Sequence, residues 1–419
     1  MIGKKIYDPV HGFIRISSLE KELIDSYVFQ RLHYIRQLGA TYLVYPGATH
    51  TRFEHSLGVM EVATEIFDKI TKTAVTMPLV YWRQIVRLAA LCHDLGHLPF
   101  SHLAEKKILK EEGHEKWTIR AIESIFLQPI WEKIQKEFPD KSIIEDVIKT
   151  AIGENKLKNI NSTWQTVSFS PWDRVMSQII SGDFFGADRI DYLLRDAKCT
   201  GVSYGLFDYH QLIETLRILP SIEGAKEDLT LGIEENGIES CEALLLARHF
   251  MHKRVYQHHS VQAYSFHMGQ FMVKFYEKTN PLSSFKEYFS YTDNEILYEL
   301  RKAFLDPEQE NHLDALSLFI KENRYQAIEI PRDISQEELL KWKTSCQIQE
   351  KMIEFSPVIS SKQKALLSFP VLKKGNIVEA QSCSQLFIPS FNPGWLYLSP
   401  TISLEAQKLL SALLEKQKG

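Results

Sequence analysis

The sequence predicts a mainly α-helical protein with small β-hairpins, whose last third is a less regular α+β region. Apolar residues recur at intervals of three and four between Leu57 and Ile70, and again between Ile85 and Leu95, as amphipathic helices require. After residue 325, short alternating runs such as YQAIEI mix with helical patterns. No repeat of about 20–50 residues is visible, which argues against a solenoid.

The composition is that of an ordinary globular protein. Of 419 residues, 44% are hydrophobic and 24% are charged, and the net charge of −4 does not predict a nucleic-acid partner. The five cysteines are scattered without a CxxC pair, which indicates reduced thiols. No segment reaches membrane-spanning length, and the first residues lack the apolar run of a secretion signal. We therefore expect a cytoplasmic protein with no membrane partner.

The elements follow in chain order. KKIYDPVHGFIRI, near the N-terminus, predicts a hairpin that turns at Asp-Pro and Gly. Residues 71–78 separate the first two long helices, and the polar residues 153–172 are expected to form a long surface loop. Residues 228–240 contain Asn-Gly and predict a second hairpin. Residues 241–259 predict one continuous helix.

The C-terminal part has a different character. Thr292 and Glu295 have the spacing of a capping box at the start of a helix. The runs YQAIEI, GNIVEAQ, QLFIPS and GWLYL predict strands, and LEAQKLLSALLEKQ predicts a final helix. We therefore divide the chain into a helical domain, residues 1–280, and an α+β region, residues 281–419, which we expect to serve oligomer contacts.

The stretch LCHDLGHLPFSH concentrates groups that bind metals. His93 and Asp94 are adjacent, and Gly96 and Pro99 are expected to end the helix just after them. Imidazole and carboxylate ligands suit Fe, Mn, Zn or Ni. Taken alone, an adjacent histidine and aspartate are more often a hydrogen-bonded core histidine and a helix cap than two metal ligands.

Three other segments favour a functional site over that structural interpretation. HTRFEHSLG places a cation and a histidine ahead of a helix, and GADRIDYLLRDAK has a polar face that a solvated surface would explain by itself. The helix of residues 241–259 carries Arg248, His252 and Tyr256 at intervals of four, a pattern that favours a site over a surface. Arginines fork onto phosphates and tyrosines pack against rings, while no GxxxxGK[ST] loop is present. Together these segments predict metal-assisted hydrolysis of a phosphate ester.

The order His55, His93-Asp94, Asp188 resembles the H…HD…D signature of the HD-domain phosphohydrolases. Within that family, four ordered blocks look like the dNTP triphosphohydrolases and their bacterial dGTPase-like members. The similarity runs from about Lys4 to His267. The blocks are FQRLHYIRQLGATYLVYPGATHTRFEHSLGV, LCHDLGHLPFSH, DRIDYLLRDA and HKRVYQHH. The resemblance implies an HD-type helical core as the catalytic domain.

The resemblance also implies roles for individual residues. The ligands of one transition-metal ion (Fe, Mn, Zn or Ni) would be His55, His93, Asp94 and Asp188, with Mg accompanying the substrate phosphates. Catalytic positions match His97, His102 and His114, together with Glu105, which stands where relatives carry an aspartate. Phosphate, sugar and base positions match Gln37, Arg52, Arg189, Tyr192, Asp196, Arg248 and Tyr256, to which the helix pattern adds His252.

The implied reaction is hydrolysis of a dNTP to a deoxynucleoside and triphosphate, by water attack on the α-phosphorus. His102 is our preferred general acid for the leaving 5′-oxygen. The resemblance also implies a homo-oligomer, either a dimer or a tetramer. Two alternatives remain open: an HD phosphohydrolase that acts on a monophosphate, cyclic or alarmone nucleotide, and a non-catalytic nucleotide- or nucleic-acid-binding relative.

The sequence departs from the family at the site for an activating guanine nucleotide. Asp25 and Gln30 match that pattern, but His33 stands at the arginine position and Tyr7 at the asparagine position. Because a histidine lacks the bidentate guanidinium, we expect weaker recognition of guanine. We also expect no SAM domain, since the hairpin begins at about residue 4.

Overall fold

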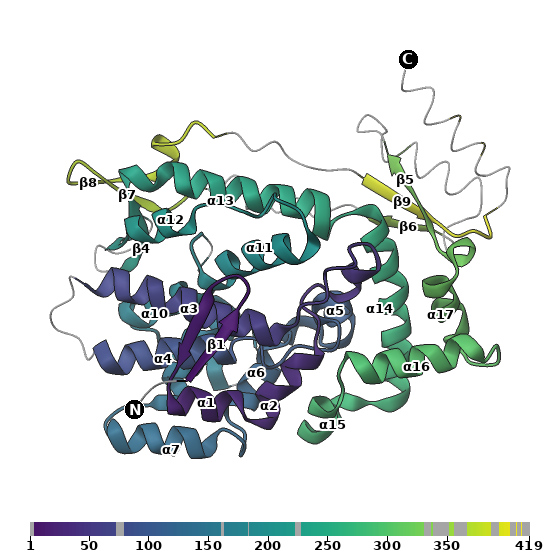
Figure 1. The fold of residues 1–419 in the computed structure, drawn as a ribbon, viewed down its shortest axis with the longest axis horizontal. Coiled ribbons are helices and arrows are strands. Elements are labelled where there is room, and N and C mark those ends of the chain that lie inside the picture. Colours follow the sequence, from purple (N-terminus) through teal and green to yellow (C-terminus); the bar gives the residue numbers. More distant parts are fainter. Residues whose placement is uncertain are drawn as a thin grey trace.

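Three helices form the centre of the fold: α3 (Arg52–Thr71), α4 (Leu79–Cys92) and α11 (Ala187–Thr200). We describe them from a computed structural model (Figure 1). Helix α3 packs against both α4 and α11, and its apolar side chains, Leu57 and Ile66 among them, are buried. The prediction of a mainly α-helical protein is confirmed. The structure describes residues 4–72, 79–160, 163–182, 184–222, 228–330, 337, 352–355, 367–386, 394–402, 408 and 412.

Shorter helices surround this centre, and α8 and α10 pack on α4. Before α3 the helical segments are α1 (Ser18–Ile24), α2 (Tyr27–Gln30), η1 (Arg31–Tyr34) and η2 (Gly39–Leu43). Between α4 and α11 they are η3 (Ser101–Leu103), α5 (Glu105–Ile108), η4 (Lys110–Glu112), α6 (Glu115–Ile122), α7 (Gln128–Glu137), α8 (Ile143–Ile152), α9 (Glu154–Asn159), η5 (Thr163–Thr166) and α10 (Pro171–Ser181).

The other helical segments among the described residues follow α11 in the chain. These are α12 (Tyr209–Thr215), η6 (Glu235–Gly237), α13 (Ile238–Met251), the π-helical turn η7 (His252–Tyr256), α14 (His259–Thr279), η8 (Pro281–Ser283), α15 (Phe285–Ser290), α16 (Asp293–Leu305), α17 (His312–Phe319), η9 (Lys321–Asn323) and η12 (Ala380–Ser382). Among the described residues, no helix combines the length and the apolar character needed to cross a bilayer.

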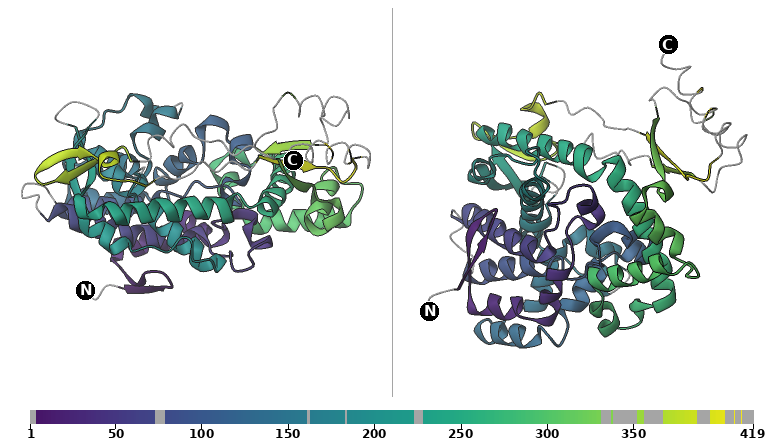
Figure 2. Two further views of the ribbon diagram at one scale, coloured as in Figure 1. Left: turned by 90° about the horizontal axis from the view of Figure 1, so that it is seen from above. Right: turned by 45° about the vertical axis from the view of Figure 1, so that its right-hand side comes forward.

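Three small sheets lie at the periphery. The N-terminal hairpin pairs β1 (Lys4–Asp8) with β2 (Gly12–Ile16) and projects from one side of the helical layer (Figure 2, left). The other two sheets lie at opposite ends of the molecule in both figures. One has the order β3-β4-β7-β8 and the other β5-β9-β6. Their strands are β3 (Leu216–Pro220), β4 (Leu229–Glu234), β5 (Gln326–Ile330), β6 (Met352–Phe355), β7 (Pro370–Lys373), β8 (Asn376–Glu379) and β9 (Gly394–Leu398).

Several predicted elements are confirmed. The N-terminal hairpin forms, the capping box joins Thr292 and Glu295 at the start of α16, and three of the four predicted C-terminal strands appear as β5, β8 and β9. Residues 73–78 of the predicted break, most of QLFIPS and nearly all of the predicted final helix lie outside the described residues.

Three predicted elements are wrong. Residues 153–172 do not form a long loop, because α9 and η5 occupy much of the segment. The Asn-Gly of residues 228–240 lies in η6 and leads into α13, while β4 pairs with the preceding β3 and with the distant β7. The helix predicted over residues 241–259 ends in the π-helical turn η7, and a new helix begins at His259.

Residues just after position 280 pack on the helical centre. Tyr27 donates to the Phe289 carbonyl at 3.0 Å, and the Nε atom of Arg31 donates to the Tyr291 carbonyl at 3.0 Å. Tyr288 donates to the Gly96 carbonyl and stacks on Trp117 at 3.7 Å between ring centroids. Helix α15 therefore supports the turn after α4, whereas a domain boundary at residue 280 stays a prediction.

The end of α4 lies close against the start of α6, and Gly96 permits this approach. A Cβ atom at Gly96 would lie 2.2 Å from the His114 carbonyl oxygen and 2.3 Å from the Thr118 nitrogen. Both neighbours are backbone atoms, so neither can rotate away.

We therefore expect Gly96→Ala to lower the free energy of unfolding by about 3 kcal/mol, as overpacking does. Gly201→Ala is the control, because Gly201 has a φ of +77° and nothing within 4 Å, so the change adds only backbone strain of about 1 kcal/mol. Urea denaturation measures both values. Equal losses in the two variants would contradict the proposed close approach.

Candidate functional site

A cavity of about 530 Å³ opens between the end of α4, α11 and the turn η7. Its wall contains twelve of the sixteen site residues that the sequence predicts. These are Gln37, Arg52, His93, Asp94, His97, His102, His114, Asp188, Tyr192, Asp196, His252 and Tyr256. The other four, His55, Glu105, Arg189 and Arg248, are not part of the wall.

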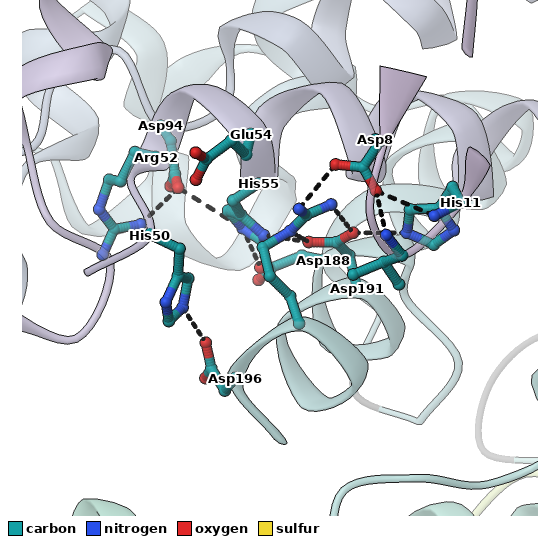
Figure 3. Close-up of polar contacts among 12 residues, drawn as sticks. Asp8, His11, His50, Arg52, Glu54, His55, Asp94, Asp188, Asp191 and Asp196 are labelled. Atoms are coloured by element: carbon teal, nitrogen blue, oxygen red, sulfur yellow. Dashed lines mark hydrogen bonds and ion pairs between the residues drawn. The ribbon is translucent and has the colours of Figure 1, made fainter. Parts of the chain in front are cut away.

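The four predicted metal ligands converge at one end of this cavity. The Nε2 atom of His55 lies 3.1 Å from Asp188 Oδ1 and 3.6 Å from Asp94 Oδ2. The Nε2 atom of His93 lies 3.4 Å from Asp94 Oδ1 and 3.9 Å from Asp188 Oδ1. Figure 3 shows His55 between Asp94 and Asp188, which come from the ends of α4 and α11. Residues far apart in the sequence thus bring two nitrogens and two carboxylates together: the ligand atoms of His55, His93 and Asp94 all lie within 4.8 Å of one another, and Asp188 adjoins both histidines.

These residues fit a metal ion. Ligand atoms about 2.1 Å from one ion lie roughly 3.0–3.5 Å apart at tetrahedral angles, and the pairs given above are separated by 3.1–3.9 Å. In addition, the Nε2 atom of His93 is buried and has no hydrogen-bond partner among the described residues, while its Nδ1 atom lies 2.7 Å from the Ala90 carbonyl oxygen. An orphaned buried nitrogen is costly unless something binds it.

The four predicted ligands His55, His93, Asp94 and Asp188, which we call the quartet, are surrounded by charges that offset one another. Burial works to raise the pKa of Asp94, but Arg52, which donates to its Oδ2 atom, and the neighbouring histidines hold it well below its ordinary value. Burial works to lower the pKa of His55, but Asp188 and Asp191 raise it to about 10. A cation that binds His55 at Nε2 must therefore displace a proton.

A single carboxylate orients two of the predicted catalytic histidines. Glu105 accepts from His102 Nδ1 at 2.5 Å through Oε2, and from His114 Nδ1 at 2.6 Å through Oε1. Against the effect of burial, these two bonds lower the pKa of Glu105 below its ordinary value. The Nε2 atoms of both rings remain for other partners. His97 stacks on His114 at 3.6 Å, and burial together with Arg52 holds the pKa of His97 well below its ordinary value.

The loop that carries His102 is held in a strained conformation. Phe100 and Ser101 have φ values of 57° and 59°, which non-glycine residues rarely adopt. Asp293, at the start of α16, accepts from the Phe100 nitrogen at 2.7 Å, and Ser101 Oγ accepts from Arg52 Nε at 2.8 Å. Strain of this kind persists only where the surroundings enforce it, as they do here.

Another part of the cavity wall is formed by aromatic and polar groups. The hydroxyl of Tyr256 donates to Asp196 Oδ2 at 2.7 Å, and His50 Nε2 lies 2.7 Å from Asp196 Oδ1. Both carboxylate oxygens of Asp196 therefore already have a hydrogen-bond partner. A sugar hydroxyl that binds Asp196 would have to donate to an oxygen that also contacts Tyr256 or His50. Tyr192 lies beside Tyr256, with 6.4 Å between ring centroids.

Two arginines lie near the cavity without lining it. The guanidinium groups of Arg189 and Arg248 have buried nitrogens without a hydrogen-bond partner among the described residues. Burial, with the nearby Arg248 and Arg189 charges, lowers the pKa of His252 to about 4. A neutral His252 between two cations suits an anion better than a metal.

Comparison with known proteins agrees with this geometry. Residues 52–193 match the HD domain, and residues 207–354 match the HD associated region. The chain contains an HD domain, followed by an HD associated region.

The relatives include enzymes and uncharacterized proteins. An uncharacterized protein of Methanocaldococcus jannaschii is 37% identical over 259 residues, covering 62% of this chain and 47% of that protein. The deoxynucleoside triphosphate triphosphohydrolase SAMHD1 of Gallus gallus is 32% identical over 272 residues, covering 61% of this chain and 43% of that protein. The chain thus spans about half the length of the curated relatives it matches. A crystal structure of a hypothetical protein from Aquifex aeolicus has a TM-score of 0.76 and 28% identity, covering 97% of this chain and 100% of that chain.

Sequence reasoning missed several residues of this candidate site. Lys156 lines the cavity and pairs with Glu115 at 2.7 Å, but it lies in α9, where a loop was expected. Asp191 is fully buried and hydrogen-bonded to His55, although its place on the polar face of its helix indicated solvent. The motif HTRFEHSLG also begins with His50, whose nearness to Asp196 no local pattern could reveal.

The pair of His50 and Asp196 should make stability depend on pH. Burial works to lower the pKa of His50, but Asp196, together with Cys199, raises it to about 9. Because the folded pKa exceeds the unfolded value of about 6.5, the stabilisation is complete below pH 6.5 and is lost as pH rises through 9.

We therefore expect the difference in unfolding free energy between wild type and His50→Gln to shrink by up to roughly 3 kcal/mol between pH 6.5 and 9.5. Urea denaturation at both pH values measures it. A difference that does not change with pH would mean that His50 is neutral in the folded protein.

Proposed function

We propose that this protein is a metal-dependent dNTP triphosphohydrolase that releases a deoxynucleoside and intact triphosphate. One observation carries the proposal: His93, Asp94 and Asp188 of the metal-ligand set line the same cavity as three further histidines and two tyrosines. The similarity to SAMHD1, a deoxynucleoside triphosphate triphosphohydrolase, supports the same substrate class.

The metal centre would be held by His55, His93, Asp94 and Asp188. When bound there, a transition-metal ion supplies a water molecule of lowered pKa and an electrophile for a phosphate oxygen. Arg52 lies beside Asp94 and lines the cavity, so its guanidinium meets the phosphate nearest the quartet.

The remaining cations favour a polyphosphate over a monophosphate. Arg189 and Arg248 have buried nitrogens to satisfy, and Lys156 lines the wall by α9. With Arg52 these residues supply four positive charges around one cavity, more than a monophosphate requires. Tyr192 and Tyr256 offer ring faces and a hydroxyl on the cavity wall, where a sugar and base would pack.

His102 is suited to protonate the leaving 5′-oxygen. Its Nδ1 atom is held by Glu105, which leaves Nε2 for the substrate, and its side chain is 66% exposed. His114 shares the same carboxylate, and His97, stacked on it, faces the cavity as a neutral ring. We assign these two histidines to positioning and to phosphate contacts.

The decisive experiment tests substrates directly. The Mn²⁺-loaded protein is incubated with each dNTP and each NTP, singly and in pairs, and the products are separated by anion-exchange chromatography. We expect triphosphate and deoxynucleoside from dNTPs and little from NTPs. Release of monophosphate, or turnover of only cyclic or alarmone nucleotides, would assign a different HD phosphohydrolase. Binding without any turnover would assign a non-catalytic relative.

The role of His102 has its own test. We expect His102→Ala to lower kcat by about a hundredfold or more, because it removes a general acid. The metal content, measured by mass spectrometry, should not change, since His102 is outside the quartet. The matched control is His210→Ala on α12, whose side chain is 69% exposed. Turnover retained in His102→Ala would exclude His102 as the general acid.

A further inference from the structure

The turn of the N-terminal hairpin reaches the interior of the helical centre. Its residues Asp8 and His11 lie against α11, far away in the sequence. The Nε2 atom of His11 lies 2.6 Å from Asp191 Oδ1, and Asp8 Oδ2 accepts from Arg195 at 2.8 Å. Figure 3 shows these residues on the side of His55 that faces away from Asp94. The hairpin is thus joined to the rear of the candidate metal centre.

Asp191 is the residue on which these contacts meet. Its Oδ2 atom lies 2.7 Å from His55 Nδ1 and accepts from Arg195 Nε at 2.9 Å. Its Oδ1 atom meets His11 and accepts from a second Arg195 nitrogen at 2.9 Å. Arg195 donates to both oxygens of Asp191, so the buried carboxylate is held as an ion by a guanidinium.

An ionised carboxylate only accepts hydrogen bonds, so Nδ1 of His55 must donate to Asp191. The opposite ring nitrogen, Nε2, then points to Asp94 and Asp188 as a metal ligand. Carboxylates in this position fix the ring orientation of ligating histidines in other metalloproteins. In this chain the carboxylate is itself held by a residue of the hairpin.

Gly58 indicates that the sequence makes room for this arrangement. It lies one turn after His55 on α3, and a Cβ atom there would lie 1.9 Å from Asp191 Oδ1 and 2.4 Å from an Arg195 nitrogen. The side chains that would collide are buried and paired on every side, so they cannot move away cheaply. The contact of α3 with the Asp191–Arg195 pair therefore requires glycine.

We propose that the hairpin turn is a positioning element of the metal centre, in which His11 acts through Asp191 to hold His55 towards the cation. The inference rests on the metal-ligand set of the proposed function. His11 is itself fixed, because its ring meets the edge of Tyr209 with 6.0 Å between centroids and its side chain is 1% exposed. Without His11, Asp191 Oδ1 keeps only its bond to Arg195, and the carboxylate is free to turn towards that guanidinium and away from His55.

The test measures metal affinity in the full chain. Metal-free wild type, His11→Ala and His11→Gln are titrated with Mn²⁺ by calorimetry at one pH. We expect His11→Ala to bind about tenfold more weakly, the lower end of the effect of residues that support metal ligands. His11→Gln should restore most of the affinity, because its amide nitrogen takes the place of Nε2 and donates to Asp191. The unfolding temperature of each metal-free variant is recorded alongside.

The control variant is Phe13→Ala, on the same hairpin. Phe13 is 65% exposed, packs on Tyr7 and has no contact with Asp191. We expect its metal affinity to equal that of wild type. Unchanged affinity in His11→Ala, or an equal loss in all three variants, would overturn the positioning role. Failure of wild type to bind Mn²⁺ would overturn the ligand set itself, and the substrate proposal is tested separately by turnover.

Discussion

The fold depends on how a buried carboxylate is neutralised between two helices. Asp191 lies on α11 against α3, fully buried, where an unpaired charge would cost several kcal/mol. Arg195, one turn later, supplies the opposite charge, and His55 and His11 fill the remaining acceptor positions. Because the carboxylate of Asp191 needs all three partners, its neutralisation links the packing of α3 on α11 with the position of the hairpin turn.

A second buried carboxylate, that of Asp293, holds the backbone of the loop that presents His102 to the cavity. Asp293 accepts from the backbone nitrogens of Phe100 and Arg36, and burial raises its pKa to about 6. These bonds fix the loop that presents His102, while Arg31 binds the His97 carbonyl at 2.8 Å. The site is therefore rigid, because its buried polar groups have no access to water and hydrogen-bond to one another. Apolar packing alone would not fix their positions.

The sequence predicted the quartet and the histidine group because their residues fall in short blocks, HTRFEHSLG, LCHDLGHLPFSH and DRIDYLLRDA among them, whose order resembles that of a known family. It failed at Asp191 for a physical reason: helical periodicity separates apolar from polar faces, but it cannot tell a polar face that meets solvent from one that meets a buried network. It failed at Lys156 because the polar composition of residues 153–172 hid the helix α9. The partner of β4 also escaped prediction, since β7 lies more than a hundred residues away.

The candidate site extends beyond the matched HD domain on both sides in the sequence. The matched HD domain covers residues 52–193, yet the site also uses His11 before it and His252, Tyr256 and Asp293 after it. The HD domain contains the proposed metal ligands and catalytic histidines, which lie in short recognisable blocks. The outer segments contact Asp191 behind His55, contribute Tyr256 and His252 to the cavity wall and support the His102 loop. In the proposed function, selectivity between nucleotides would reside in those segments and in Tyr192, because the quartet alone cannot distinguish one phosphate ester from another.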